Sequence, residues 1–304
     1  VVNLFKKRSD FEVKVYEKEK TLSLDEGYGI QLAQNSVSVL NKINFSKISN
    51  INLYNPNKLN FYSADENKIS DLNLSKFNTS SIKYTSLKRS SLIEFLKEDL
   101  FSNNMMFGKV LKRVSKIKEK LLINFSDNTN DLVDYIIVSD GVFSNTKNVI
   151  ENKNIKPVYN GSVAVRTIIK PTQEFNYEKN NISLIMLKNA HIVIYPVNQK
   201  NELNLVCIIR HKFSNKIDTK LLIKEKIISQ NKNFENLFLN KLESWPIYIT
   251  KKAFKSEFEN IFYLGDAFYT FPPTMAQGAS QSIEAAYELF EVLCKESKNF
   301  QNIY

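Results

Sequence analysis

The sequence predicts an α/β protein in which a discontinuous three-layer domain, residues 1–156 and 255–304, contains an inserted mixed or antiparallel β-sheet domain, residues 157–254. Three observations support this prediction. A strand pattern near the N-terminus ends in a carboxylate, consecutive strand patterns fill the middle, and a buried strand, a loop and an amphipathic helix come near the C-terminus. The consecutive strand patterns in the middle of the sequence favour a separate sheet. The strand–loop–helix unit near the C-terminus is typical of α/β folds.

The composition is that of an ordinary globular protein. Its 304 residues are 43% hydrophobic and 24% charged, which is enough for a large core. No uninterrupted apolar run approaches the ~18 residues that a membrane helix needs. No signal-peptide pattern opens the sequence. We therefore expect a cytoplasmic protein.

The net charge of +10 has two interpretations. A basic chain can bind nucleic acid or an anionic membrane surface, or it can simply carry solvated lysines. The lysines are scattered and no basic patch is interleaved with aromatic residues, so we expect no nucleic-acid partner and find no indication of membrane contact. Two distant cysteines and two histidines leave little room for a disulfide framework or a metal site, and none is predicted.

The N-terminal segment reads as the end of a helix, residues 1–7, followed by an alternating strand over Phe11 to Glu17. In a dinucleotide-binding βαβ unit, the second strand ends in an acidic residue that bonds a ribose, about 20 residues after a Gly-rich turn. Glu17 fits this role, but the first glycine is Gly27. We therefore expect an N-terminally truncated chain that lacks the first strand and the G-x-G-x-x-G turn. The alternative is an edge strand with an exposed glutamate.

The next segments combine glycines with a helix start. Gly27 and Gly29 flank Tyr28, and this arrangement allows a ligand to approach the backbone closely. A helix is predicted over 36–43, a polar hairpin region over 50–80, and another helix over 86–96 that carries Arg89 in its first turn. A plain loop and a surface arginine are the alternative interpretations.

Three short strands are predicted over 110–114, 121–125 and 135–138. The third leads into Asp140 and Gly141, which form a turn signal directly after a buried strand. In the predicted inserted domain, strands are expected over 161–169, 182–187, 190–196 and 204–210, before a helix-rich stretch over 218–242. Arg166, His191 and Tyr195 lie on these strands as substrate-side candidates, although a strand histidine or tyrosine is more often a core or rim residue.

The C-terminal segment predicts a ligand site. A strand over 261–264 is followed by Gly265 and Asp266, a loop stiffened by Pro272 and Pro273, and a helix that begins near Ser280. Ligands of α/β folds lie at the carboxyl ends of strands. A helix N-terminus offers unpaired N–H groups and partial positive charge, and a carboxylate can accept hydrogen bonds from a polyol.

This segment resembles the C-terminal flavin motif of the FAD-dependent aromatic hydroxylases, the group A flavoprotein monooxygenases. The strands of the middle region are similar to those of the salicylate-hydroxylase-like branch, which has the p-hydroxybenzoate-hydroxylase fold. The positions that match the flavin motif are Gly265, Asp266, Ala267, Pro272, Pro273, Gln277, Gly278 and Glu284. Three positions depart from it: Tyr269 replaces the usual histidine, Ala276 a glycine and Ala285 an aspartate.

The resemblance implies a Rossmann-like FAD-binding domain and a monooxygenase reduced by NADH or NADPH. A flavin C4a-hydroperoxide would deliver an oxygen atom from molecular oxygen to a small aromatic substrate. The implied cofactor contacts are Glu17 to the adenosine ribose, Arg89 to the phosphates or ribityl chain, Asp140 and Gly141 near the pyrophosphate, Asp266 to the ribityl hydroxyls, and the N–H groups of Gln277, Gly278 and Ala279 to the isoalloxazine. Pro272 and Pro273 would line the substrate side.

Two other interpretations stay open from the sequence. One is a related FAD oxidoreductase that acts on a quinone precursor or an isoprenoid, and the other is a non-catalytic truncated homologue. Without the Gly-rich turn, the chain is expected to bind FAD weakly or not at all. The sequence does not distinguish NADH from NADPH, nor a monomer from a homodimer.

Overall fold

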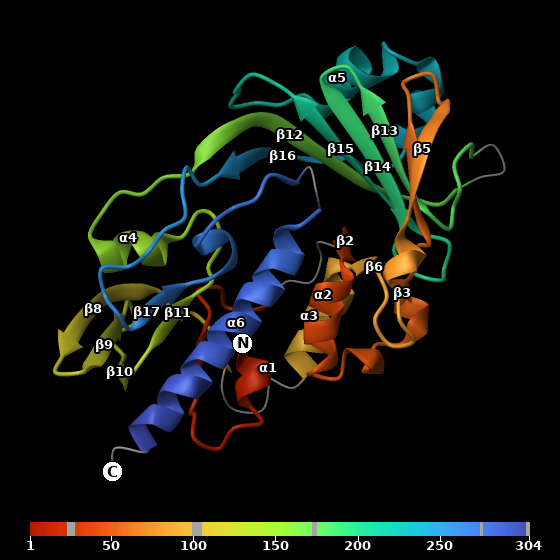
Figure 1. The fold of residues 1–304 in the computed structure, drawn as a ribbon. Helices are drawn as coiled ribbons and strands as arrows, with labels where there is room; N and C mark the ends of the chain where they lie inside the picture. Colours follow the sequence, from red (N-terminus) through yellow and green to blue (C-terminus); the bar gives the residue numbers. More distant parts are fainter. Residues whose placement is uncertain (23–27, 99–104, 172–174, 274–275, 302–304) are drawn as a thin grey trace.

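A seven-stranded sheet dominates the protein (Figure 1). The smaller sheets and most helices lie on one side of it, and the helical segments of residues 219–238 lie on the other. The structure is a computed structural model that describes residues 1–22, 28–98, 105–171, 175–273 and 276–301. The long C-terminal helix runs through the middle of the molecule, between the small sheets and a group of shorter helices. The mixed α/β class predicted from the sequence is therefore confirmed.

The large sheet has the strand order β16-β12-β15-β14-β13-β4-β5. All its neighbouring strands are antiparallel except β13 and β4, which are parallel. Its strands, in chain order, are β4 (Lys58–Tyr62), β5 (Lys68–Asn73), β12 (Val158–Ile169), β13 (Ile182–Leu187), β14 (Ala190–Pro196), β15 (Leu203–Arg210) and β16 (Glu243–Ile249).

The two faces of the large sheet have different surroundings because side chains alternate along each strand. Val163, Val165 and Cys207 point to one face and are completely buried in a core that also includes Phe234. Helical segments on that side belong to the same core; they are α5 (Thr219–Ile223), one π-helical turn (Lys224–Ile228) and a 3-10 helix (Lys232–Phe238). The opposite face, which carries Arg166, looks toward the rest of the protein.

Four smaller sheets form the other part of the molecule. Two are parallel pairs: β1 (Val15–Tyr16) with β7 (Met105–Met106), and β11 (Ile136–Val138) with β17 (Ile261–Tyr263). The other two are antiparallel and three-stranded. Their strands are β2 (Gly29–Leu32), β6 (Thr85–Lys88) and β3 (Leu53–Tyr54) in one, and β10 (Asn130–Val133), β9 (Lys120–Phe125) and β8 (Leu111–Ile117) in the other.

The helices of this part pack against those sheets and against each other. The remaining helices are α1 (Val2–Phe5), α2 (Gln34–Asn41), α3 (Arg89–Glu98), α4 (Asn145–Glu151) and α6 (Gly278–Gln301), with short 3-10 turns at Phe45–Lys47, Asn50–Asn52, Leu74–Phe77 and Gly265–Ala267. Leu32 and Leu87 are completely buried where α2, α3 and the start of α6 converge. No helix in the described ranges is both long and apolar enough to cross a membrane.

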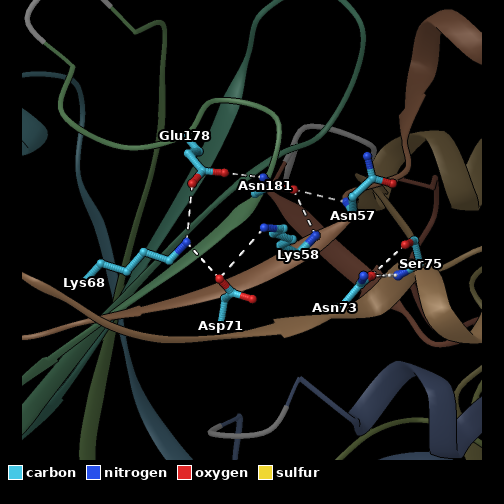
Figure 2. Close-up of polar contacts among 8 residues, drawn as sticks. All are labelled: Asn57, Lys58, Lys68, Asp71, Asn73, Ser75, Glu178 and Asn181. Atoms are coloured by element: carbon cyan, nitrogen blue, oxygen red, sulfur yellow. Dashed lines mark hydrogen bonds and ion pairs between the residues drawn. The ribbon is translucent and has the colours of Figure 1, made fainter.

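Polar side-chain contacts lie where the β4–β5 hairpin joins the rest of the large sheet (Figure 2). The side-chain oxygen of Asn181, just before β13, accepts a hydrogen bond of 2.9 Å from the backbone N–H of Lys58. The ammonium of Lys68 lies 3.0 Å from Asp71 and 3.6 Å from Glu178. Such exposed ion pairs contribute little stability each, so the main-chain ladder between β4 and β13 makes the attachment.

The structure differs from the sequence predictions at several places. The predicted strand over 11–17 is only two residues long, and the helix-rich stretch over 218–242 is split into α5, the π turn and a 3-10 helix. Strand β16 occupies a segment for which no strand was predicted. The large sheet also takes β4 and β5 from residues 58–73, which lie outside the predicted 157–254 segment, because β4 pairs with β13.

Candidate cofactor and substrate site

A cavity of about 260 Å³ lies between the large sheet and the segments that face it. Its walls come from five separate stretches of the chain. The lining residues are Tyr28, Arg89, Ala164, Arg166, Trp245, Ile247 and Pro273. The cavity therefore joins Arg89 and Pro273, two residues predicted from the sequence, to the sheet that carries the substrate-side candidate Arg166.

The sheet wall of the cavity follows from strand alternation. Ala164 and Arg166 are two residues apart on β12, and Trp245 and Ile247 are two residues apart on β16. Ala164 pairs directly with Trp245 in the ladder, so all four side chains share one face. The wall is thus apolar and aromatic with one guanidinium group set into it.

Arg166 is held beside two aromatic rings. Its guanidinium carbon lies 5.9 Å from the ring centre of Tyr28 and 5.8 Å from that of Trp245, within the range of a cation–π interaction. The two rings are nearly perpendicular, with centres 5.4 Å apart. The Nε of Arg166 is buried and makes no hydrogen bond in the described part of the chain.

A second cluster lies where the parallel strands β11 and β17 end. Their pairing places Asp140 and the turn Gly265–Asp266 at the same edge of a sheet, and the N–H of Leu264 donates to the carbonyl of Val138. Gly265 has a φ of +56°, and a Cβ there would lie 3.1 Å from the Ser282 hydroxyl on α6. Glycine is therefore favoured both by the conformation of the turn and by its close approach to the helix.

Asp266 carries a carboxylate that accepts no hydrogen bond from any described residue. Part of its surface stays open, yet the protein around it restricts hydration of the carboxylate and raises its pKa above the ordinary 3.8. An exposed and unpartnered acceptor beside a helix N-terminus fits the hydroxylated chain of FAD. Asp140, by contrast, already accepts a 3.2 Å hydrogen bond from the N–H of Thr146 at the start of α4.

Two glycines leave the backbone open to a ligand. A Cβ at Gly141 or at Gly278 would have no neighbour within 4 Å. Gly141 has a φ of +84°, so the turn after β11 favours glycine for its conformation as well. Gly278 is the first residue of α6, where helix N–H groups lack partners within the helix. The open backbone at both positions fits a closely approaching anionic cofactor.

Two segments singled out in the sequence are joined at the start of α6. The amide of Asn35 donates a 2.6 Å hydrogen bond to Glu284, and the hydroxyls of Ser36 and Ser280 are 3.0 Å apart. Both contacts link α2 to α6, and they fix the beginning of α6 relative to strand β2. Glu284 is one of the positions that match the flavin motif, and its hydrogen bond with Asn35 shows that this side chain helps to hold α6 against α2.

Ala276 is strained, and replacing it with glycine is expected to stabilise the protein by about 0.5–1 kcal/mol. Its φ of +52° lies in the left-handed region, which costs an L-residue about 1–2 kcal/mol; the greater freedom of glycine in the unfolded chain offsets part of the gain. Chemical denaturation of Ala276→Gly measures the effect. The matched control, Ala279→Gly inside the first turn of α6, is expected to change stability in the opposite direction.

Gly29 lies very close to other atoms, but these atoms belong to the large sheet and the residue after it rather than to a ligand site. A Cβ at Gly29 would lie 2.7 Å from atoms of Asn204 and Val197 and 2.8 Å from the Tyr195 ring. The N–H of Gly29 donates a 2.7 Å hydrogen bond to Asn204. The close approach predicted for this glycine therefore joins β2 to the large sheet. Gly27 lies outside the described residues.

Other predicted site residues lie away from the cavity lining. Tyr195 is buried with Val197 in a small core cluster, and burial raises the pKa of its hydroxyl. His191 is half-buried, its Nε2 has no hydrogen-bond partner in the described structure, and burial lowers its pKa. Pro272 is half-buried beside Pro273. Glu17 follows β1, and its carboxylate accepts a 2.9 Å hydrogen bond from the N–H of Glu19.

Sequence reasoning missed four lining residues: Tyr28, Ala164, Trp245 and Ile247. Trp245 is the only tryptophan of the chain, and it alternates with Ile247 in a strand pattern. That alternation was the available signal for β16. The pairing of β16 with β12, which brings Trp245 beside Arg166, is a long-range contact that no local pattern encodes.

Comparison with known proteins supports the same fold. No protein-family model matches the chain. Among curated proteins, the chain is 23% identical over 226 residues to the FAD-dependent monooxygenase eupB of Phoma sp. The match covers 68% of this chain and 51% of eupB, so the chain spans about half the length of this relative.

Solved structures match more of the chain. HpxO of Klebsiella pneumoniae, complexed with FAD and uric acid, aligns over 93% of this chain and 73% of its own, with a TM-score of 0.79 and 14% identity. A salicylate hydroxylase substrate complex aligns over 94% of this chain and 74% of its own, with a TM-score of 0.76 and 16% identity. The 2,6-dihydroxypyridine-3-hydroxylase of Arthrobacter nicotinovorans aligns over 97% of this chain and 80% of its own, with a TM-score of 0.74 and 18% identity. The chain therefore has the fold of the FAD-dependent aromatic hydroxylases.

Proposed function

We propose that the protein is an FAD-dependent monooxygenase that hydroxylates a small aromatic substrate with molecular oxygen, using NADH or NADPH as reductant. The observation that carries this proposal is the cavity between Arg89, Pro273 and the large sheet, in a fold shared with aromatic hydroxylases. Its volume of about 260 Å³ suits a molecule of one or two rings better than a long isoprenoid chain.

The residues that would hold FAD surround this cavity and the adjoining sheet edge. Asp266 would accept hydrogen bonds from the ribityl hydroxyls, and Arg89 would neutralise phosphate or contact the ribityl chain. The N–H groups of Gly278 and Ala279 would face the ring system at the positive end of α6. Glu17 and the turn Asp140–Gly141 would serve the ribose and the pyrophosphate. When bound, FAD supplies the redox chemistry and the activation of oxygen.

The chain's own residues would orient the substrate and exclude water. Trp245 and Ile247 present an apolar wall on β16, and Pro273 closes the opposite side of the cavity. An aromatic ring packed against Trp245 would be held by edge and face contacts. Removing water from this space would protect a reactive oxygen donor from unproductive decay.

The test measures cofactor binding and substrate-dependent turnover separately. FAD is added to the 304-residue chain, and binding is followed by flavin fluorescence. NADH and NADPH oxidation and oxygen consumption are then recorded with and without a panel of phenols and aromatic acids. Stimulation of both rates together with a hydroxylated product is expected. FAD binding without stimulation by any aromatic would favour a different flavin-dependent reaction, and absence of FAD binding would contradict the proposed function.

A further inference from the structure

A row of four aromatic side chains crosses one end of the large sheet, outside the cavity lining. Tyr159 at the start of β12 pairs with Tyr248 at the end of β16, and their ring centres lie 6.0 Å apart. The ring centre of Phe213, which follows β15, lies 5.4 Å from that of Tyr159. At the other end, the ring centre of Phe143, in the turn before α4, lies 5.0 Å from that of Tyr248. Four separate segments of the chain thus form one aromatic row.

The aromatic row is fixed at its centre and open at its ends. The Tyr159 hydroxyl donates a 2.8 Å hydrogen bond to the carbonyl of His211, which holds its ring beside the end of β15. Phe143 is 64% exposed and Phe213 is 57% exposed. A single exposed apolar side chain needs no explanation, whereas a contiguous group of them marks a surface that binds something.

Lysines border the same row. Each of them is exposed and lies within four residues of one of the rings: Lys156, Lys212, Lys251 and Lys252. None of them forms an ion pair with another described residue. Lys156 and Lys251 flank one end of the β12–β16 ladder. Asp140 is the one acidic residue within the same distance along the sequence, and its carboxylate accepts a hydrogen bond from the N–H of Thr146. The border of the row is therefore positively charged.

The aromatic row and its lysines together match the chemistry of a nucleotide. Bases stack on aromatic side chains, and each stacked base contributes substantially to binding. Phosphate groups are attracted by lysine ammonium groups. A simple anion would use only the lysines, and an apolar molecule would use only the rings. The observations therefore favour a ligand that carries both a base and phosphates.

We propose that the aromatic row binds the adenosine end of the nicotinamide dinucleotide that reduces the flavin, and that the bordering lysines favour NADPH over NADH. This inference rests on the proposed function, which requires such a reductant. NADPH carries one phosphate more than NADH, on the adenosine ribose, and a phosphate monoester has a charge of about −1.5 to −2 at neutral pH. Lysines beside the bound adenosine would therefore attract NADPH more strongly.

The place of the row in the fold suits this role. Phe143 lies two residues after Gly141, in the turn that would hold the FAD pyrophosphate. Tyr248 directly follows Ile247, which lines the cavity. The row thus begins next to the proposed cofactor site and extends away from it to Phe213. A dinucleotide held by its adenosine near Phe213 would have its nicotinamide end directed toward the flavin.

Nucleotide fragments test the binding step without turnover. Isothermal titration calorimetry measures ADP-ribose, its 2′-phosphate and nicotinamide mononucleotide against the protein, with and without saturating FAD. The 2′-phosphate is expected to bind at least about fivefold more tightly than ADP-ribose, and the mononucleotide more weakly than both. Added sodium chloride should weaken binding of the 2′-phosphate, because salt screens exposed lysines. FAD should not compete, because it would occupy a different site.

The contribution of the rings is measured with a double variant, Phe143→Ser with Phe213→Ser. It is expected to weaken binding of both ADP-ribose compounds by about tenfold, because the base loses its stacking surface. The control is Phe77→Ser, which removes a ring that is 65% exposed in the 3-10 helix after β5. The control should bind like the wild type. Circular dichroism verifies that each variant is folded.

The contribution of the lysines is measured with Lys156→Gln combined with Lys251→Gln. This variant is expected to bind the 2′-phosphate at least about threefold more weakly and to lose much of the preference for it over ADP-ribose. The control combines Lys220→Gln with Lys224→Gln, two exposed lysines of the helical segments that cover the large sheet. It removes the same net charge and should keep both the affinity and the preference.

Three results would overturn the inference. The first is unchanged nucleotide binding by both folded variants. The second is loss of nucleotide binding when FAD is saturating, which would mean that the fragments had occupied the flavin site. The third is cosedimentation of the protein with vesicles of phosphatidylserine and phosphatidylcholine that the ring variant abolishes while its nucleotide binding is intact, because the row would then contact a lipid surface.

Failure of this inference is distinct from failure of the proposed function. If both variants oxidise NADPH with wild-type kinetics in the presence of an aromatic substrate, the monooxygenase stands and the reductant binds elsewhere. If the protein hydroxylates no aromatic compound but the rings and lysines still determine binding of the ADP-ribose compounds, the row is a dinucleotide site and the reaction is a different one.

Discussion

Replacing Gly29 with alanine is expected to lower the free energy of unfolding by about 3 kcal/mol. The new methyl group would lie 2.7 Å from the Cβ of Asn204 and from a methyl of Val197, far inside van der Waals contact. The Asn204 Cβ cannot move without a shift of the large sheet, since a Cβ is fixed by its backbone. The Val197 side chain is completely buried, so its methyl has little room to rotate away. Urea denaturation followed by circular dichroism measures the change.

Gly278→Ala is the matched control for this substitution. It adds the same methyl group at the first residue of α6, where no atom lies within 4 Å, and is expected to be neutral or stabilising by less than about 1 kcal/mol. The position of Gly29 predicts a further effect, because strand β2 and the Tyr28 side of the cavity would separate from the sheet. If Gly29→Ala proved as stable as the control, β2 would not be packed on the large sheet as described.

Replacing Asp266 with asparagine is expected to stabilise the cofactor-free protein at neutral pH and to weaken FAD binding by about tenfold to a hundredfold. The two effects have opposite signs because they involve different states of one carboxylate. In the cofactor-free protein its charge is poorly hydrated and lacks a partner, whereas in the complex it would accept hydroxyl hydrogen bonds. Thermal unfolding without FAD and flavin titration measure the two effects.

The pH dependence distinguishes this explanation from a general effect of the substitution. Because burial raises the folded-state pKa of Asp266 above 3.8, the folded state binds the proton more tightly than the unfolded state. The stability linked to this proton is fully present below the unfolded pKa and is lost as pH rises through the folded pKa. The stability of Asp266→Asn relative to the wild type should therefore increase as pH rises from acid toward neutral. A constant difference at every pH would contradict the burial argument, and unchanged FAD affinity would remove Asp266 from the cofactor site.

Local patterns predicted the parts of the fold that depend on neighbours in sequence. The strands over 182–187 and 190–196 were placed at the bounds that the structure shows, and the Gly-Asp turn after residues 261–264 lies at the end of β17 as expected. Periodicity captures such features because each strand or helix buries one face whatever its partner is.

Local patterns do not predict which distant segments pair with each other. The parallel contact of β4 with β13 joins segments whose order in the sheet follows from neither hydropathy nor turn chemistry. The neighbours of Gly29 were unknown for the same reason, so a glycine that packs against protein was interpreted as one that faces a ligand. The individual cofactor contacts, the choice of NADH or NADPH, the oligomeric state and the cytoplasmic location stay predictions.

The β4–β5 hairpin is synthesised long before its partner. More than a hundred residues separate the end of β5 at Asn73 from the start of β13 at Ile182. At ~5–20 residues per second, a ribosome needs about 5–20 s to bridge that interval. During this time the newly synthesised hairpin has an unpaired strand edge, and such edges promote aggregation. The unpaired edge is that of β4, which later pairs with β13, while β5 on its other side carries Lys68 and Asp71, charges that oppose aggregation of the hairpin.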